Sequence, residues 1–141
     1  MKKVSALGLD VGRKRMGVAG CDGTGLIATG LTTIYRTSLA EDIRQLQAII
    51  KEREIEVLVI GLPYTLDGNI GSQAKKIQKF ASRIAKILEL PVEYVDERLT
   101  SVEAEARLKA SKKFSTRDKG AIDRQAAAII LQQWLDMRRS S

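Results

Sequence analysis

Three segments that lie far apart in the chain carry acidic residues of the kind that metal-dependent hydrolysis uses. Asp10 ends a first apolar run, Asp96 and Glu97 end a later one, and Asp123 begins a helical repeat near the carboxyl end. Carboxylates that are brought together repel one another, and a divalent cation relieves that repulsion. Two such ions can activate a water and stabilise the leaving oxygen of a phosphodiester, with no histidine required. These acids therefore predict a nuclease site if the fold brings them together.

The paired acids Asp96 and Glu97 cannot both join such a cluster. Successive residues of a strand point to opposite faces of the sheet, so only one of them can share a face with Asp10. Glu97 is the expected ligand, since it lies at the carboxyl end of its strand, where the ligands of α/β sheets gather. The alternative is that both are solvated, with Asp96 contributing to the cap of the next helix.

Asp123 shares a helical face with Ala126, Ala127 and Ile130, an apolar stripe that is expected to face the sheet. An acid in the first turn also complements the helix dipole, but that role does not require the apolar side. A buried carboxylate without a partner is costly, so we expect a cation or a strong donor beside it. The two alanines would let the helix approach the sheet closely.

Asp10 allows a simpler interpretation, because an aspartate at a strand end often only opens a turn. Its strand neighbours on the same face, Gly8, Ala6 and Val4, are small or medium in size. They leave space beside the carboxylate, as a site requires.

The composition restricts the chemistry further. The chain of 141 residues has no histidine, which excludes Ser-His-Asp and Cys-His triads and His-based zinc sites. Oxygen ligands suit Mg²⁺ or Mn²⁺. The net charge of +7 favours an anionic partner such as nucleic acid. The lone Cys21 excludes an internal disulfide, and no apolar run approaches the roughly 20 residues of a membrane helix. We expect a cytoplasmic protein with no membrane partner.

Periodicity and turn signals predict an α/β fold with the order β-β-β-α-β-α-β-α-α. Ser38 with Glu41, and Thr100 with Glu103, form capping boxes, and Ser72 is the expected cap of a further helix. One five-stranded mixed sheet with helices on both faces is expected in a single domain over 1–137, followed by a frayed tail over 138–141. The expected strands are 4–9, 16–21, 26–35, 57–62 and 92–96, and the expected helices are 38–54, 72–88, 100–108 and 121–137.

Four blocks, in order, resemble the signatures of the YqgF/RuvX family: LGLDVGRKRMGVA (7–19), VIGLPYTLDGNIGSQA (59–74), VDERLTSVEAE (95–105) and KGAIDRQAAAIILQQWL (119–135). The resemblance covers essentially the whole chain. It implies a ribonuclease H-like fold and a nuclease that matures the 5′ end of pre-16S rRNA or, alternatively, resolves Holliday junctions. It also implies that Asp10, Glu97 and Asp123 are catalytic and bind Mg²⁺ or Mn²⁺, with Asp96 as the lesser choice. No clear fourth acid is present, so the number of ions stays open.

Basic residues near these acids are the expected nucleic-acid contacts, although each taken alone is better explained as a solvated surface charge. The backbone amides of Gly71 and Ser72, at a helix start, are a further expected phosphate-binding loop. With six aromatic residues, recognition of the backbone and shape of structured RNA or branched DNA is favoured over base stacking. The expected contacts are Arg13, Lys14, Arg15, Arg98, Lys112, Lys113, Arg117, Lys119 and Arg124.

Two other classes of function remain open on the sequence. The block at 8–19 also resembles the phosphate loop of the actin and sugar-kinase group, which would make the chain a nucleotide-binding phosphotransferase. A non-catalytic nucleic-acid-binding module would explain the charge but not an aspartate on an apolar face. Junction resolution requires two symmetric sites and hence a homodimer, whereas a monomer suffices for RNA processing.

Overall fold

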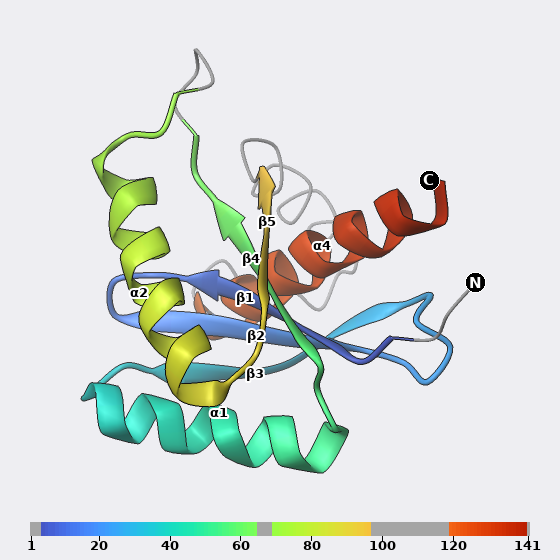
Figure 1. The fold of residues 1–141 in the computed structure, drawn as a ribbon, viewed down its shortest axis with the longest axis horizontal. Helices are drawn as coiled ribbons and strands as arrows, with labels where there is room; N and C mark the ends of the chain where they lie inside the picture. Colours follow the sequence, from blue (N-terminus) through green and yellow to red (C-terminus); the bar gives the residue numbers. More distant parts are fainter. Residues whose placement is uncertain (1–3, 65–68, 97–118, 141) are drawn as a thin grey trace.

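The structure of the chain is a computed structural model that describes residues 4–64, 69–96 and 119–140. Its elements within these ranges are five strands and three long helices (Figure 1). The strands are β1 Ala6–Val11, β2 Arg15–Cys21, β3 Ala28–Tyr35, β4 Val57–Leu62 and β5 Val92–Asp96, and the helices are α1 Leu39–Arg53, α2 Ser72–Leu88 and α4 Lys119–Ser140.

The five strands form one mixed sheet in the order β3-β2-β1-β4-β5. Strands β1, β2 and β3 form an antiparallel meander, while β4 pairs parallel to both β1 and β5. The parallel pairs are possible because α1 and α2 return the chain to the same end of the sheet. The expected five-stranded mixed sheet is therefore confirmed.

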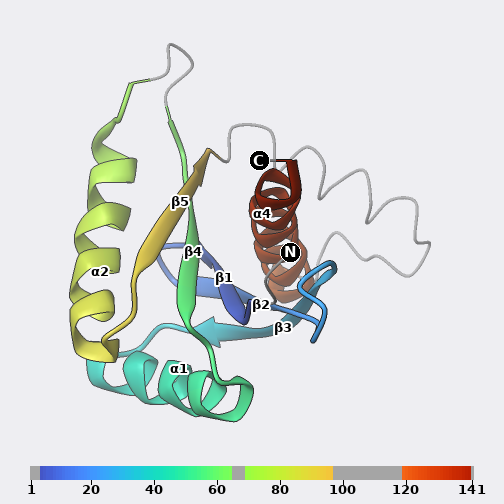
Figure 2. The ribbon, with the colours of Figure 1, turned by 45° about the vertical axis from the view of Figure 1, so that its right-hand side comes forward.

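Helices cover both faces of the sheet, as expected. Figure 2 shows α1 and α2 on one side and α4 on the other. Large aliphatic side chains such as Leu9, Ile60 and Ile84 form the core beneath α1 and α2. The core beneath α4 contains more small residues, among them Ala6 and Ala127. The two faces of the sheet are called the α1/α2 face and the α4 face below.

The helix starts agree with the sequence at α1 and differ at α2. The Ser38 hydroxyl accepts a hydrogen bond from the Glu41 amide at 3.2 Å, so the predicted cap of α1 is confirmed. Helix α2 instead has Gly71 as its N-cap, with no side-chain cap, and Ser72 is its first helical residue. The prediction that Ser72 caps α2 was wrong, because the extended backbone that precedes the helix is that of Gly71.

Helix α4 is longer than the sequence predicts at both ends. It begins at Lys119 rather than near residue 121 and continues past Met137 to Ser140, so 138–140 belong to the helix. Arg138 and Arg139 lie in its last turn, where positive charge complements the helix dipole. The helix expected at 100–108 lies outside the described residues. Of the helices that are described, none has the length and apolar character needed to cross a membrane.

Candidate functional site at the carboxyl end of strand β1

Asp10 lies on the α4 face, at the end of β1. It pairs in register with Gly17 of β2, and directly opposed residues of an antiparallel pair project from the same face. A side chain at Gly17 would collide with the carbonyl oxygen of Asp123, the fifth residue of α4. The absence of a side chain at Gly17 therefore allows the N-terminal part of α4, at Asp123, to lie against the sheet immediately beside the position of Asp10.

The same close approach continues along the helix. A Cβ atom added to Gly8 would lie 2.7 Å from the Leu131 Cβ and 3.0 Å from the Ala127 carbonyl oxygen. Ala126 and Ala127 are both buried, at 6% and 0% relative exposure. Small residues on both surfaces thus allow the backbone of α4 to lie against β1 and β2, as expected from the sequence.

Asp123 lies on the sheet side of α4 and has a strong donor. The Arg15 Nε donates to the Asp123 Oδ2 at 2.6 Å, and the Asp123 side chain is only 17% exposed. Arg15 is two residues from Gly17 on β2 and so shares the α4 face. The hydrogen bond to Asp123 raises the pKa of the Arg15 guanidinium, which stays charged. The partner expected for a partly buried Asp123 is thus found in this arginine.

Two further contacts hold the start of α4 on strand β3. The Thr33 hydroxyl donates to the Gly120 carbonyl at 2.8 Å, and the Arg124 Nη1 donates to the Thr33 hydroxyl at 3.3 Å. Thr33 is the register partner of Gly17, so these bonds fix the same turn of α4 that carries Asp123. Arg124 therefore has a structural contact within the fold, while Lys119 is exposed at the beginning of the helix.

The alternation of β5 separates the paired acids at its end. Glu93 accepts a hydrogen bond from the Trp134 indole at 3.1 Å, which places it on the α4 face together with buried Val95. Tyr94 packs into the core beneath α1 and α2. Asp96 follows the same alternation and projects from the α1/α2 face, away from Asp10.

Several predicted site residues fall outside the part of the chain that the structure describes. Within residues 4–64, 69–96 and 119–140, no three Asp, Glu or Cys side chains form a group that could hold a metal ion. Asp10 and Asp123 are the described members of the predicted ligand set, and their carboxylate oxygens suit Mg²⁺ or Mn²⁺. The residues outside the described ranges are Glu97, Arg98, Lys112, Lys113 and Arg117.

The turn between β1 and β2 exposes Arg13 and Lys14 next to Asp10. Backbone hydrogen bonds hold this turn: the Gly12 amide donates to the Arg15 carbonyl at 2.9 Å, and the Arg36 amide donates to the Lys14 carbonyl at 2.8 Å. The Arg36 guanidinium also donates to the Gly12 carbonyl at 2.5 Å. The two exposed cations are thus presented on a fixed backbone.

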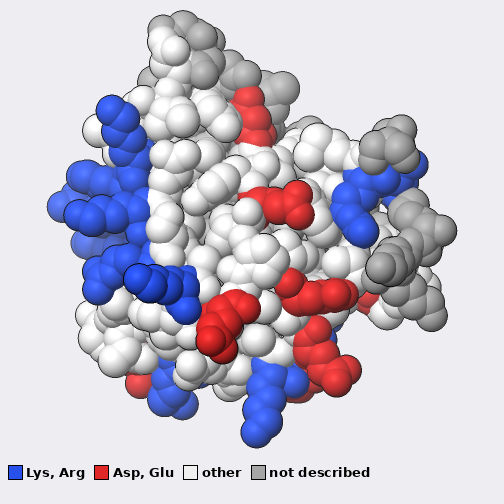
Figure 3. Space-filling view, viewed as in Figure 1, with Lys and Arg blue, Asp and Glu red and all other residues white. Residues whose placement is uncertain are grey.

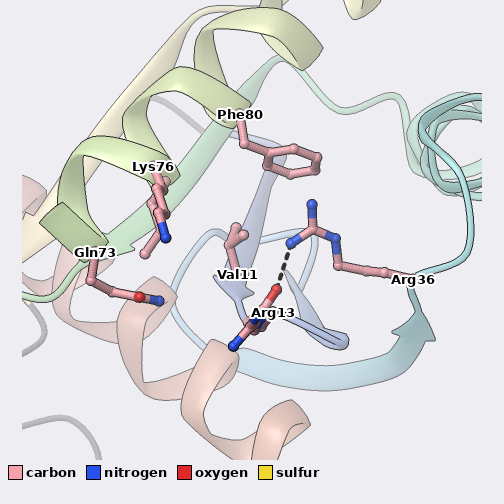
Figure 4. Close-up of a pocket in the computed structure, with 8 residues that line it drawn as sticks. Val11, Arg13, Arg36, Gln73, Lys76 and Phe80 are labelled. Atoms are coloured by element: carbon pink, nitrogen blue, oxygen red, sulfur yellow. Dashed lines mark hydrogen bonds between the residues drawn. The ribbon is translucent and has the colours of Figure 1, made fainter.

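On the α1/α2 side of this turn, a cavity of about 350 Å³ lies between β1, Arg36 and α2 (Figure 4). Sequence reasoning identified only Arg13 among its charged residues and missed Arg36, Lys76 and the aromatic Phe80. The spacing of Gln73, Lys76 and Phe80 along one face of α2 was the available signal. The cavity is lined by Val11, Gly12, Arg13, Arg36, Gln73, Lys76, Ile77 and Phe80.

Comparison with known proteins gives a consistent family match. Residues 4–137 match the family RuvX, described as Holliday junction resolvase. A protein of Rippkaea orientalis (strain PCC 8801 / RF-1) is 71% identical over 139 residues, which cover 99% of this chain and 100% of that protein. One of Crocosphaera subtropica (strain ATCC 51142 / BH68) is 69% identical over 100% of this chain and 99% of its own length. Both bear the name "Putative pre-16S rRNA nuclease".

Solved structures share the fold at low sequence identity. The RuvC of T. thermophilus in complex with a Holliday junction substrate superposes with a TM-score of 0.59 at 12% identity, covering 96% of both chains. The Fowlpox virus resolvase in complex with Holliday junction DNA superposes with a TM-score of 0.59 at 10% identity, covering 96% of this chain and 99% of that one. The expected ribonuclease H-like fold is confirmed by these likenesses.

Proposed function

Because the chain belongs to the RuvX (YqgF) family, we propose that it is a metal-dependent nuclease that processes the 5′ end of pre-16S rRNA in the cytoplasm. The names of the relatives, which match over nearly their whole length, support this function. One structural observation supports it: the backbone of Asp123, near the N-terminal end of α4, lies directly over Gly17, the register partner of Asp10. Asp10 and the backbone of Asp123, more than a hundred residues apart in the chain, thus lie beside the same glycine between sheet and helix.

The proposed metal ligands and catalytic residues are Asp10, Glu97 and Asp123. Glu97 is preferred to Asp96 because Glu93 and Val95 occupy the α4 face of β5, so that Asp96, which follows Val95, projects from the other face. Mg²⁺ or Mn²⁺ bound there would activate water and stabilise the leaving oxygen. Asp10 is the proposed bridging ligand if two ions bind.

The basic residues have two proposed tasks. Arg13 and Lys14, on the hydrogen-bonded β1–β2 turn beside Asp10, hold a phosphate of the substrate near the carboxyl end of β1. Arg15 pairs with Asp123, and a metal ion held by that carboxylate would leave the Arg15 guanidinium available to a substrate phosphate. The remaining proposed contacts to nucleic acid are Arg98, Lys112, Lys113, Arg117, Lys119, Arg124 and the amides of Gly71 and Ser72.

The test is cleavage of a pre-16S rRNA leader with Mn²⁺ or Mg²⁺, compared with the same reaction in EDTA. We expect Asp10→Asn and Asp123→Asn to lose at least about a hundredfold in rate, as for loss of a group that stabilises charge in the transition state. RNA affinity and melting temperature should be largely retained. Asp136→Asn, an exposed position on the same helix as Asp123, is the matched control and should cleave normally. Full activity in EDTA or in Asp10→Asn would refute the proposal.

Holliday junction resolution is the second candidate, and the description of the matching family favours it. Symmetric cleavage of a four-way junction needs two active sites and hence a homodimer, whereas a monomer can process RNA. Cleavage of the junction by a dimer, with the leader RNA left intact, would support resolution. Equilibrium dialysis that shows ATP binding, with neither substrate cleaved, would support a nucleotide-binding protein instead.

A further inference from the structure

The cavity beside α2 lies on the opposite side of the same strand end as the proposed catalytic acids. Asp10 projects to the α4 face, and the next residue, Val11, projects into the core beneath α1 and α2 and lines the cavity. Consecutive Cα atoms are about 3.8 Å apart. Only the β1–β2 turn, which carries Arg13, separates the cavity from the position of Asp10.

The cavity is strongly cationic. Arg13 and Lys76 are exposed, and no described acid forms an ion pair with either of them. Figure 4 shows Lys76 and Gln73 extending from α2 toward the turn, opposite Arg36. A second depression of about 260 Å³ adjoins it, shares Arg13, Arg36 and Phe80, and adds Arg83.

Helix α2 extends this charge along the molecule. It has five basic residues and no acidic one, and Figure 3 shows the Lys and Arg side chains gathered along its outer side. Lys76, Phe80 and Arg83 are spaced by four and three residues, so they share the helix face that lines the two depressions. The five basic residues are Lys75, Lys76, Lys79, Arg83 and Lys86.

The Arg36 guanidinium is positioned by contacts within the protein. It donates to the Gly12 carbonyl at 2.5 Å, lies over the Phe80 ring at 4.4 Å from the centroid, and is 3.7 Å from the Asp42 carboxylate. An arginine has five N–H donors in a fixed fork that matches phosphate geometry. Because its side chain is already ordered, a phosphate bound here would cost less conformational entropy.

We infer that this cavity binds the phosphodiester backbone of the RNA strand beyond the proposed catalytic acids at the carboxyl end of β1. The substrate then crosses the β1–β2 turn from the α4 face to the α1/α2 face. This inference rests on the proposed nuclease function and adds a second anchoring point to it. A volume of about 350 Å³ is at the lower end of the range of small-ligand pockets, roughly 300–1,000 Å³. Arg36, Lys76 and Arg83 outnumber the single lining carboxylate, Asp42, which favours a polyanion.

The experiment measures RNA affinity by fluorescence anisotropy in the cleavage-deficient Asp10→Asn background. We expect Lys76→Gln combined with Arg83→Gln to weaken binding by about tenfold and to reduce the slope of log K against log salt by about 0.7 for each phosphate that the variant no longer binds. The control combines Lys51→Gln with Arg44→Gln, which removes the same charge, with the same residue types, from exposed positions of α1 outside both depressions. The control should change affinity less than twofold. Equal losses in both variants, or no loss in either, would overturn the inference.

A series of shortened RNAs tests whether the ligand is a strand. The loss of RNA affinity caused by Lys76→Gln with Arg83→Gln should vanish when the RNA is shortened on one side of the cleavage site. It should persist when the RNA is shortened on the other side. A penalty that is independent of length, or equal for a free nucleoside monophosphate, would show a nucleotide site and overturn the strand path. Cleavage by the wild type with Mn²⁺, measured in parallel, keeps the two proposals distinct. Its absence refutes the nuclease function, whereas its presence with unchanged binding refutes only the second anchor.

Discussion

The two faces of the sheet differ in the size of the side chains that they present to the helices. On the α1/α2 face, Leu7, Leu9 and Met16 are fully buried and pack against the aliphatic sides of two helices. On the α4 face, the same two strands present Gly8 and Gly17, which leave room for the backbone of α4. The first face buries large apolar area, and the second allows two backbones to come close together.

The α4 face has less buried side-chain area at Gly17 than the α1/α2 face has at its large residues, and α4 lies closer to the sheet there. Burial of a large aliphatic side chain contributes about 1.5–3 kcal/mol, which glycine cannot supply. The α4 face lacks that contribution at Gly17, and the backbone of Asp123 lies instead directly over Gly17, the register partner of Asp10. The small residues of the α4 face therefore permit the close approach of α4, while the large residues of the α1/α2 face bury apolar area.

The largest expected change in stability is on the α1/α2 face. Leu9→Ala removes a fully buried side chain next to Asp10 in the chain but on the other face, and should lower the free energy of unfolding by about 2–5 kcal/mol. Denaturant titration followed by the fluorescence of buried Trp134 measures it. Metal affinity of the folded variant should be unchanged. Lost metal affinity at unaltered stability would show that the two faces are not separable.

A smaller loss of stability with a larger loss of function is expected on the α4 face. Gly17→Ala places a Cβ against the Asp123 backbone, so α4 must shift, at a cost of about 1–3 kcal/mol. Because the shift moves Asp123 away from Asp10, cleavage should fall far more than stability. Gly23→Ala is the matched control, since nothing lies within 4 Å of its added Cβ. Normal cleavage by Gly17→Ala would mean that the position of this turn does not matter.

The smallest expected effect concerns the ion pair between Arg15 and Asp123. Arg15→Gln removes a positive charge that competes with a metal ion for the carboxylate, so Mn²⁺ affinity should rise by a few fold, equivalent to about 1 kcal/mol or less. RNA affinity should fall at the same time, because the variant has one cation fewer to bind a phosphate. Isothermal titration with Mn²⁺ measures the first effect. A decrease in Mn²⁺ affinity would show that Arg15 positions Asp123 for the metal rather than occupying its place.

Much of this fold could be predicted from local patterns. The continuous apolar run of β4 and the capping box of α1 gave boundaries that the structure confirms. Strand β3 starts later than predicted, at Ala28, because the Asp22 carboxylate accepts hydrogen bonds from the amides of Leu26 and Ile27 and holds them in the turn. Local side-chain competition of this kind is not visible in a hydrophobic pattern.

The candidate site was only partly predictable. The apolar stripe around Asp123 indicated its orientation, and alternation along β1 indicated that of Asp10. Its partner Arg15 was expected to bind nucleic acid, and no pattern in the sequence reveals that it reaches Asp123 across 108 positions. The cavity was also missed. The spacing of its α2 residues is visible in the sequence, but Arg36 and the β1–β2 turn meet them only when α2 packs beside that turn.

Anomalous diffraction from crystals grown with Mn²⁺ tests most directly whether Asp10 and Asp123 bind the same metal ion. We expect an ion bonded to carboxylate oxygens of both Asp10 and Asp123, with the Arg15 side chain displaced from Asp123. Crystals at a saturating Mn²⁺ concentration that show no ion between these two aspartates, while the same protein cleaves RNA, would contradict it.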